Sequence, residues 1–307
     1  MDASPFNGSR TKSSQDSVVG ALQPVLSAII ISRGDEKTIE RTVASVVGQK
    51  TAEPFEVILV ASGGDRTAAI VRNRFPSVRV IDLERPALPG QARNAGLAVA
   101  RGDYVSFPGS HVELPPGSLA ARIAAHRKGY AMVTGSILNG TKTPAGWASY
   151  FMDHSDALPG RPSGELATPP AHCSYDRRVL AASGWFPEDM RAGEDTVVNL
   201  RLWQQGHRAY RAQDVYLCHI SRCTTFWRLV RHHFVRGRAW GRILVERGTG
   251  FPELSRYVGR RLQRTMANVE AWGGDLAPEF ARVRFLVRLG IVAAFLGMIS
   301  EIGLRRR

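Results

Sequence analysis

The sequence has few cysteines and no long uncharged segment near its C-terminus, and each shortage excludes a class of protein. Its three cysteines, Cys173, Cys218 and Cys223, lack the short paired spacing of a zinc knuckle or a disulfide framework. We therefore expect a reducing, cytoplasmic compartment. In the apolar segment 285–304 the longest uninterrupted uncharged run is the twelve residues 289–300, between Arg288 and Glu301, whereas a helix that spans a bilayer needs about 17 to 25 apolar residues. The segment fits better a helix packed on the protein itself or on a homodimer partner, or one lying on a membrane surface.

Residues 1–23 also lack an apolar run. They are rich in Ser, Gly, Asp and Gln and contain nothing resembling a signal peptide. We expect them to form a disordered leader.

The charges of the chain are unevenly distributed. Among its 307 residues, 41 Lys and Arg face 27 Asp and Glu, which gives a net charge of +14. Residues 223–307 alone hold sixteen arginines, no lysine and six acidic residues. This basic tail attracts phosphate-rich ligands, anionic membrane surfaces or nucleic acid. No recognised nucleic-acid-binding module accompanies it, so we expect no nucleic-acid partner.

Between residues 24 and 107 the hydrophobic pattern alternates between strand and helix. Buried-strand runs occur at 25–31, 55–60, 78–81 and 103–107, and helical periodicity lies between them at 35–49, 66–75 and 90–100. This alternation predicts an α/β fold with a mostly parallel sheet and helices on both faces. Because such sheets bind ligands at the carboxyl ends of their strands, we expect the functional residues there.

The pattern is less regular after residue 107. A helix is predicted over 119–128 and a strand over 132–138, followed by an irregular binding region over 141–170 that is rich in Gly, Pro and Ser. A helix over 194–205 and short strands at 208–211 and 215–218 end the globular part, and three helical stretches follow, at 225–246, 253–271 and 285–304. We therefore expect a leader (1–23), a globular domain (24–221) and a basic helical extension (222–307).

The most specific motif of the chain is Gly90-Gln91-Ala92-Arg93-Asn94-Ala95-Gly96, followed by Gly102-Asp103-Tyr104-Val105. With the strands before it and Glu194-Asp195 after it, the motif resembles the family 2 glycosyltransferases, nucleotide-sugar enzymes of the GT-A fold. The resemblance covers residues 24–221. From the residues alone, a helix starting at Gly90 offers N–H groups and a positive dipole end to an anion, and Arg93 adds a guanidinium. Alternatively, Arg93 pairs with an acid.

The resemblance implies a catalytic role for Asp195, beside Glu194. As the acceptor hydroxyl attacks the anomeric carbon with inversion, Asp195 would accept its proton. Alternatively, both acids only stabilise the start of a helix. The resemblance also implies a set of donor-binding residues, which are Ser32, Arg33, Ser62, Gly90, Arg93, Asn94, Ser110 and His111.

One departure from the family concerns the metal. Where the family has an Asp-x-Asp motif for a divalent cation, this chain has Gly109-Ser110-His111, so carboxylate ligands are missing. His111 and His219 are candidate ligands for a cation such as Mn²⁺ or Mg²⁺. Alternatively, no metal is needed: Arg231 and Arg238 share a helical face with Arg228 and Arg242 and would neutralise the diphosphate. That face also fits a solvated or lipid-facing basic stripe.

A second departure concerns the nucleotide base. Of the acids that follow the second strand in the family, only Asp65 is present, and we expect it to cap the next helix. The base is therefore not predicted.

The acceptor site is expected near Trp147, Tyr150 and His172, where the resemblance locates an acceptor pocket and where aromatic rings suit sugars or lipid chains. The alternative is that the aromatic residues form a small core. The Gln-x-x-Arg-Trp motif of processive polysaccharide synthases is absent from the sequence, which favours transfer of a single sugar.

Together these features predict a glycosyltransferase of the hexosyltransferase class, with a nucleotide-sugar donor and a glycan or lipid-linked acceptor. Its basic tail places it peripherally on the anionic inner face of the cell membrane. The alternative is a catalytically inactive GT-A-like binding protein at the membrane surface. The missing Asp-x-Asp favours that alternative, and the Glu194-Asp195 pair argues against it.

Overall fold

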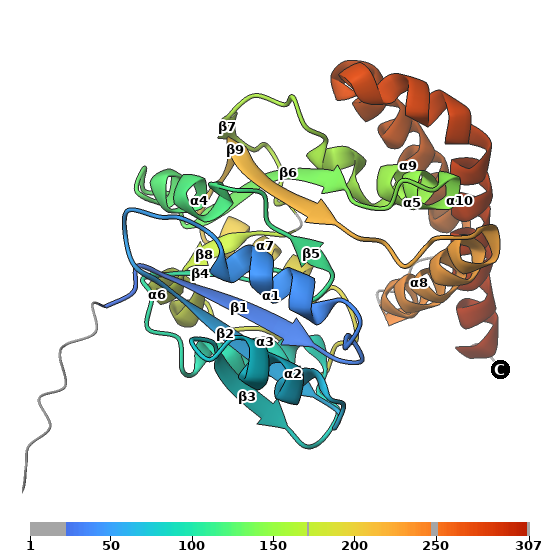
Figure 1. The fold of residues 1–307 in the computed structure, drawn as a ribbon. Coiled ribbons are helices and arrows are strands. Elements are labelled where there is room, and N and C mark those ends of the chain that lie inside the picture. The colour runs from blue at the N-terminus through green and yellow to red at the C-terminus, as the bar shows by residue number, and fades with distance from the viewer. Residues whose placement is uncertain (1–22, 171, 247–250, 306–307) are drawn as a thin grey trace, which may run out of the picture.

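The computed structural model describes residues 23–170, 172–246 and 251–305. Within these residues nine strands form one mixed sheet in the order β3-β2-β1-β4-β8-β6-β9-β5, and β7 pairs with β9 beside this order (Figure 1). The predicted leader, apart from its last residue, lies outside the described residues. The strands are β1 (Leu26–Ser32), β2 (Phe55–Ser62), β3 (Arg79–Leu83), β4 (Tyr104–Ser106), β5 (Val112–Glu113), β6 (Met132–Asn139), β7 (Gly164–Glu165), β8 (Ser174–Asp176) and β9 (Ala209–His219).

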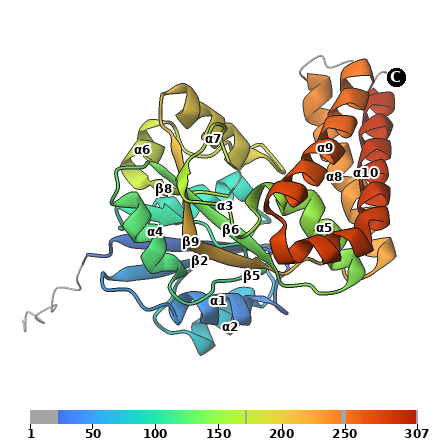
Figure 2. The ribbon, with the colours of Figure 1, turned by 90° about the horizontal axis from the view of Figure 1, so that it is seen from above.

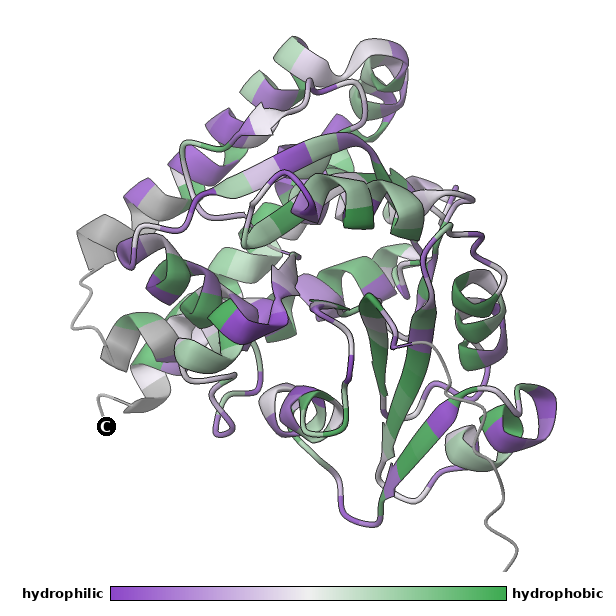
Figure 3. Ribbon diagram, turned by 90° about the vertical axis from the view of Figure 1, so that its left-hand side faces the viewer, coloured by the Kyte–Doolittle hydropathy of each residue, from purple (hydrophilic) through white to green (hydrophobic). Residues whose placement is uncertain are grey.

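The helices cover both faces of the sheet, as predicted. Apolar side chains of α1, α2 and α4 pack on one face of the β1–β2 region, and those of α3, α6 and α7 pack on the other. The strands between these layers are hydrophobic along most of their length (Figure 3). The helices of this part are α1 (Ile39–Val47), α2 (Thr67–Arg74), α3 (Pro89–Leu97), α4 (Ser118–His126), α5 (Pro144–His154), α6 (Arg177–Ala182) and α7 (Glu194–Gln204).

The sheet changes direction at its centre. Strands β3, β2, β1 and β4 are parallel, and so are β6 and β9, but β8 runs antiparallel to both β4 and β6 between them. The two short strands predicted at 208–211 and 215–218 are one strand, β9, because a register shift against β6 accommodates the polar residues between them.

The irregular binding region predicted over 141–170 is partly wrong, because residues 144–154 form helix α5. Pro144 occupies the first turn, where its fixed φ favours a helix start, and Thr143 Oγ1 caps the helix by accepting from the N–H of Gly146 at 3.1 Å. The whole segment 141–170 is rich in Gly, Pro and Ser, which is typical of a loop, so its composition did not predict this helix.

The C-terminal extension contains α8 (Phe226–Glu246), α9 (Phe251–Trp272) and α10 (Ala277–Arg305), which lie side by side beyond the end of the sheet (Figure 2). Helix α10 begins eight residues before its predicted start. The extension shares a hydrophobic core with α5, in which Phe151 packs against Phe280. The short 3₁₀ helices Ser155–Ala157 and Gly274–Leu276 complete the structure.

Helices α8 and α10 run parallel in close contact. A Cβ on Gly237 would lie 2.0 Å from the carbonyl oxygen of Ala294, and one on Gly297 would lie 2.1 Å from that of Phe234. Glycines at these positions therefore let the two backbones approach. The segment Gly274–Gly303 has the length and composition to cross a membrane, with 39% of its most apolar window buried inside the protein.

Candidate active site

A cavity of about 260 Å³ lies at the carboxyl ends of β1 and β2, at the start of α3. Three of the predicted donor-binding residues, Ser32, Arg33 and Ser62, line this cavity. The parallel crossovers of β1 and β2 place both strand ends at one edge of the sheet, which explains why residues thirty positions apart meet there. The full lining is Ile31, Ser32, Arg33, Asp35, Ser62, Ala87, Leu88, Pro89, Ala92 and Arg191.

Asp35 organises the wall of this cavity. Its buried carboxylate accepts hydrogen bonds from the hydroxyls of Ser110, at 2.6 Å, and Ser32, at 3.3 Å, and from the N–H of Arg33, at 3.2 Å. It also forms an ion pair with Arg222, which follows β9. Ser110 is thus held at the site by Asp35, and the carboxylate connects the first strand to the start of the C-terminal extension.

Asp65 caps α2, as predicted. Its Oδ1 accepts from the N–H of Thr67 at 2.9 Å, and its Oδ2 accepts from the N–H of Gly34 at 2.7 Å. The same carboxylate therefore holds the loops after β1 and β2 together.

The Gly90–Gly96 motif fastens a distant loop to α3. Asn94 Nδ2 donates to the carbonyl of Phe186 and to Glu188 Oε1, both at 2.9 Å, and Asn94 Oδ1 accepts from the N–H of Phe186. A Cβ on Gly90 would lie 1.8 Å from the carbonyl oxygen of Pro187, so the loop approaches a bare backbone. Gly90 and Asn94 thereby position the loop that carries Arg191 into the cavity.

Arg93 pairs with an acid, as the alternative from the sequence anticipated. Its buried guanidinium forms an ion pair with Glu194, the first residue of α7, and lies 5.6 and 5.1 Å from the ring centres of Phe107 and Phe186. Burial lowers the pKa of Arg93, and the nearby Asp195 opposes that shift. The pair fixes the start of α7 against α3.

Asp195 remains accessible beside this pair. It is half-buried, and its Oδ1 accepts from the N–H of Thr196 at 2.8 Å. Gly193, with a φ of +87°, adopts the left-handed conformation that turns the chain into α7. Glu194 is therefore turned inward to Arg93, whereas Asp195 stays partly exposed.

Four histidines gather near the ends of β9 and α5. The ring centres of His111 and His219 are 4.9 Å apart, those of His219 and His154 are 4.6 Å apart, and His172 lies 5.9 Å from His154. Nδ1 of His111 and Nε2 of His154 are buried without a hydrogen-bond partner among the described residues. Burial lowers the pKa of His111 and of His154 and lowers that of His219 to about 3, so these rings are neutral at pH 7. The predicted pair His111 and His219 is thus brought together.

The remaining predicted residues lie away from this cavity. Arg238 forms an ion pair with Glu301 of α10 at 2.9 Å, and Arg231 is exposed on α8; neither lines a described cavity. Trp147 and Tyr150 belong to the core shared with the C-terminal helices, where the Tyr150 hydroxyl donates to the carbonyl of Ile137 at 2.7 Å.

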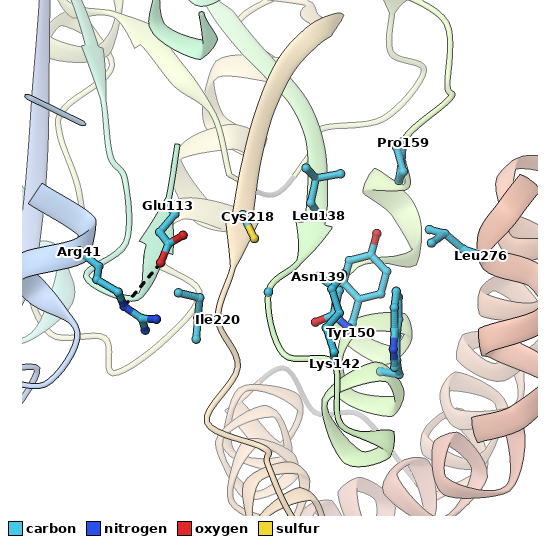
Figure 4. A pocket seen from close by; sticks show the side chains of 12 residues that line it. Arg41, Glu113, Leu138, Asn139, Lys142, Tyr150, Pro159, Cys218, Ile220 and Leu276 are labelled. Atoms are coloured by element: carbon cyan, nitrogen blue, oxygen red, sulfur yellow. Dashed lines mark ion pairs between the residues drawn. The ribbon is translucent and has the colours of Figure 1, made fainter. Parts of the chain in front are cut away.

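Trp147 and Tyr150 also line a second cavity, of about 440 Å³, that shares no lining residue with the first. Figure 4 shows this cavity between β5 and β9 on one side and Tyr150 and Leu276 on the other, with the Arg41–Glu113 ion pair at its edge.

Three residues of the site had no predicted role: Asp35, Arg191 and Arg222. Asp35 carried a signal, because an acid that follows a buried strand lies at a ligand-binding edge. The others come from segments whose approach depends on tertiary packing, which the sequence pattern does not contain.

Comparisons with known proteins agree with the fold. The model of the family described as "Glycosyl transferase family 2" matches residues 27–180. The succinoglycan biosynthesis protein ExoO of Rhizobium meliloti (strain 1021) is 31% identical over 101 residues, which are 33% of this chain and 29% of that protein. The match therefore spans less than a third of the relative's length.

Solved structures share the fold at low sequence identity. The mannosyltransferase PcManGT from Pyrobaculum calidifontis, in complex with GDP-Man and Mn²⁺, has a TM-score of 0.59 at 17% identity and covers 93% of this chain and 88% of its own. TarS from S. aureus has a TM-score of 0.51 at 16% identity, with coverages of 92% and 91%. The architecture is the predicted GT-A fold.

Proposed function

The chain belongs to glycosyl transferase family 2, and we propose that it transfers one hexose, with inversion, from a nucleotide sugar to a hydroxyl group of a glycan or lipid-linked acceptor. The observation that carries this proposal is the cavity at the ends of β1 and β2, which lies at the start of α3, the helix that Arg93 ties to Glu194. Arg33, Arg191 and the N-terminus of α3 supply positive charge for a diphosphate.

We propose that Asp195 is the general base. Its Oδ1 is held by Thr196, whereas its Oδ2 has no hydrogen bond within the described part of the chain and can accept the proton of the attacking hydroxyl. As the acceptor oxygen bonds to the anomeric carbon, the bond from that carbon to the diphosphate oxygen breaks on the opposite face, which inverts the configuration.

A divalent cation fits the histidine group rather than a carboxylate site. His111 and His219, with His154 and His172 beside them, offer imidazole nitrogens, which suit a transition metal such as Mn²⁺ better than Mg²⁺. A bound cation would neutralise the charge of the leaving diphosphate. Without one, that role falls to Arg33 and Arg191 in the cavity, and Arg231 and Arg238 would have to act from outside it.

Isothermal titration with nucleotides tests the donor site. The complexes of PcManGT, with GDP-Man and Mn²⁺, and of GalNAc-T7, with UDP, GalNAc and Mn²⁺, supply the probes: GDP, GDP-mannose, UDP and UDP-GalNAc. We expect binding of one nucleotide pair, and the same titration in EDTA and in Mn²⁺ decides between arginine and metal neutralisation. Absence of binding under both conditions would contradict the proposal.

One observation favours a second candidate, a catalytically inactive binding protein. The resemblance to the family implies a metal-binding carboxylate at the position of Gly109, and Gly109 pairs with Ile31 at the end of β1 without a side chain that could bind a metal. An inactive protein would bind a nucleotide sugar and release no nucleoside diphosphate with any acceptor.

We further propose that the C-terminal helices rest on an anionic membrane surface at its cytoplasmic face. Trp227 and Phe285 are 76% and 69% exposed, and Val235, Val292 and Leu296 are exposed on the same two helices, α8 and α10. Arginines such as Arg228, Arg231, Arg282 and Arg288 are interspersed with these apolar residues. Exposed apolar residues with flanking cations are typical of helices that bind the lipid interface.

Liposome flotation tests this surface. The full-length protein is expected to float with vesicles that contain anionic lipid, and the double variant Phe285→Ser, Leu296→Ser is expected to lose most of that binding. Leu200→Ser, which changes an exposed leucine of α7, is the matched control. Failure of the wild type to float, together with a dimer in solution, would assign the apolar face to a second copy of the chain.

A further inference from the structure

The connection from the sheet to the C-terminal helices brings a cysteine and two histidines together, apart from the four histidines described above. Cys223 follows β9 by four residues, and His232 and His233 lie in α8. The potential ligand atoms of these three residues all lie within 4.8 Å of one another. We propose that Cys223, His232 and His233 bind a transition-metal cation of the zinc class.

The burial of the three side chains supports a metal site. Cys223 and His233 are each 1% exposed, and His232 is half-buried. Nε2 of His233 is buried and has no hydrogen-bond partner among the described residues. A buried nitrogen without a hydrogen bond is unfavourable, so a bond from its lone pair to a cation would remove a penalty that the fold otherwise carries.

The chemistry of the three side chains suits a transition metal. The Sγ of Cys223 has one long contact, 4.0 Å from the carbonyl oxygen of Arg228, and would lose its proton on binding a metal. One thiolate and two imidazoles form a donor set that suits Zn²⁺ and Co²⁺ and disfavours Mg²⁺ and Ca²⁺.

Asp153 fits the role of an outer carboxylate. Its side chain is 4% exposed, and its Oδ2 lies 3.9 Å from Nε2 of His232. Arg236 and Arg261 also form ion pairs with this carboxylate, at 3.2 and 3.5 Å. A carboxylate beside a ligating histidine orients the ring and strengthens it as a ligand.

The distances require a small closure around the cation. Tetrahedral zinc, with bonds of about 2.0–2.3 Å, places its ligand atoms about 3.3–3.7 Å apart. The widest separation here would have to shrink by about 1 Å. Because His232 is half-buried, its ring is the one that we expect to move, and a water would take the fourth position.

A metal at this site would stabilise the connection between the sheet and the C-terminal helices. Cys223 directly follows Arg222, the partner of Asp35 at the donor cavity. A cation on Cys223 and α8 would therefore fix the segment that carries Arg222 to the cavity. The inference does not rest on the proposed function, because a structural metal at this point needs no sugar transfer.

Cobalt substitution tests the site in the full-length protein. After removal of metal by a chelator, we expect one equivalent of Co²⁺ to produce the near-ultraviolet charge-transfer band of a cobalt–thiolate bond, and Zn²⁺ to abolish that band. Thermal unfolding is expected to shift to higher temperature with Zn²⁺.

Variants assign the ligands. Cys223→Ser is expected to lose both the band and the thermal shift, and Cys218→Ser, which changes a half-buried cysteine of the second cavity, is expected to keep both. His233→Gln should weaken Co²⁺ binding at least tenfold. Cobalt bound without a thiolate band in the wild type would overturn the proposal whether or not Cys223→Ser folds. A band that persists in a folded Cys223→Ser variant would also overturn it.

Discussion

At the scale of single residues, two adjacent acids have different environments. Glu194 is buried against Arg93, whereas Asp195 is half-buried, with one carboxylate oxygen free of hydrogen bonds in the described structure. A carboxylate that neutralises a buried guanidinium is needed for stability, and a carboxylate with an open oxygen can take up a proton. The structure therefore gives the two acids different environments within one turn of α7, which supports the proposed division between a structural Glu194 and a catalytic Asp195.

Removing the charge of Glu194 should destabilise the fold. In Glu194→Gln the buried guanidinium of Arg93 loses its partner, and we expect the free energy of unfolding to fall by about 3 kcal/mol. Urea denaturation of the variant and of Asp195→Asn, expected within about 0.5 kcal/mol of the wild type, measures the difference. Equal stabilities of the two variants would show that Glu194 is not the structural member of the pair.

The sequence could suggest both roles of Arg93 but could not choose between them. An arginine three residues after Gly90 suits an anion or an acid equally well, and the choice depends on the loop that Asn94 holds 92 residues away. His111 and His219 were recognisable as a pair because each directly follows a strand-like segment. His154 was not, because its helix lay in a segment with the composition of a loop.

At the scale of secondary structure elements, the contact between α8 and α10 depends on glycine. Gly237→Ala would place its Cβ 2.0 Å from the carbonyl oxygen of Ala294, so the helices must separate. We expect this variant to be destabilised by about 1–3 kcal/mol.

Gly259→Ala provides the matched comparison, because nothing lies within 4 Å of a Cβ at that position of α9. There the gain in helix propensity should stabilise the chain by about 0.5–1 kcal/mol. Thermal unfolding of both variants shows whether each substitution lowers or raises the stability of the protein. A Gly237→Ala variant as stable as Gly259→Ala would refute the close packing.

Elements with clear hydrophobic periodicity could be predicted from the sequence, whereas the pairing of strands in the sheet was harder to predict. The succession of strands and helices from β1 to β4 along the chain could be predicted from alternating hydrophobic runs. Parallel crossover connections then allow few arrangements of these strands in a sheet. The antiparallel insertion of β8 between β4 and β6 did not, because a strand of three residues carries too little pattern.

At the scale of the whole molecule, buried histidines should make stability depend on pH. Burial lowers the pKa of His219 to about 3 and those of His126 and His233 to about 4, whereas an unfolded histidine titrates near ~6.5. The unfolded chain therefore binds more protons at intermediate pH. The stabilisation is complete above about pH 6.5 and is lost as the pH falls towards 4.

Each of these imidazoles adds up to about 1.4 kcal/mol per pH unit to the slope of the free energy of unfolding against pH. The pKa of the Asp153 carboxylate is held low, so the stability that this group contributes is lost only below about pH 4. Urea unfolding in EDTA between pH 7.5 and 5 measures the effect, and His219→Gln should reduce the slope. A free energy of unfolding that stays constant across this range would contradict the burial of these rings.

The most direct measurement is the release of nucleoside diphosphate by Asp195→Asn, using the donor that titration identifies. We expect kcat to fall by about 10²–10⁴-fold, because the acceptor hydroxyl loses its base, while donor affinity stays at the wild-type value. Asp189→Asn, which changes an exposed acid of the loop that precedes α7, should retain wild-type turnover. Wild-type turnover in a folded Asp195→Asn variant would show that Asp195 is not the base of this glycosyltransferase.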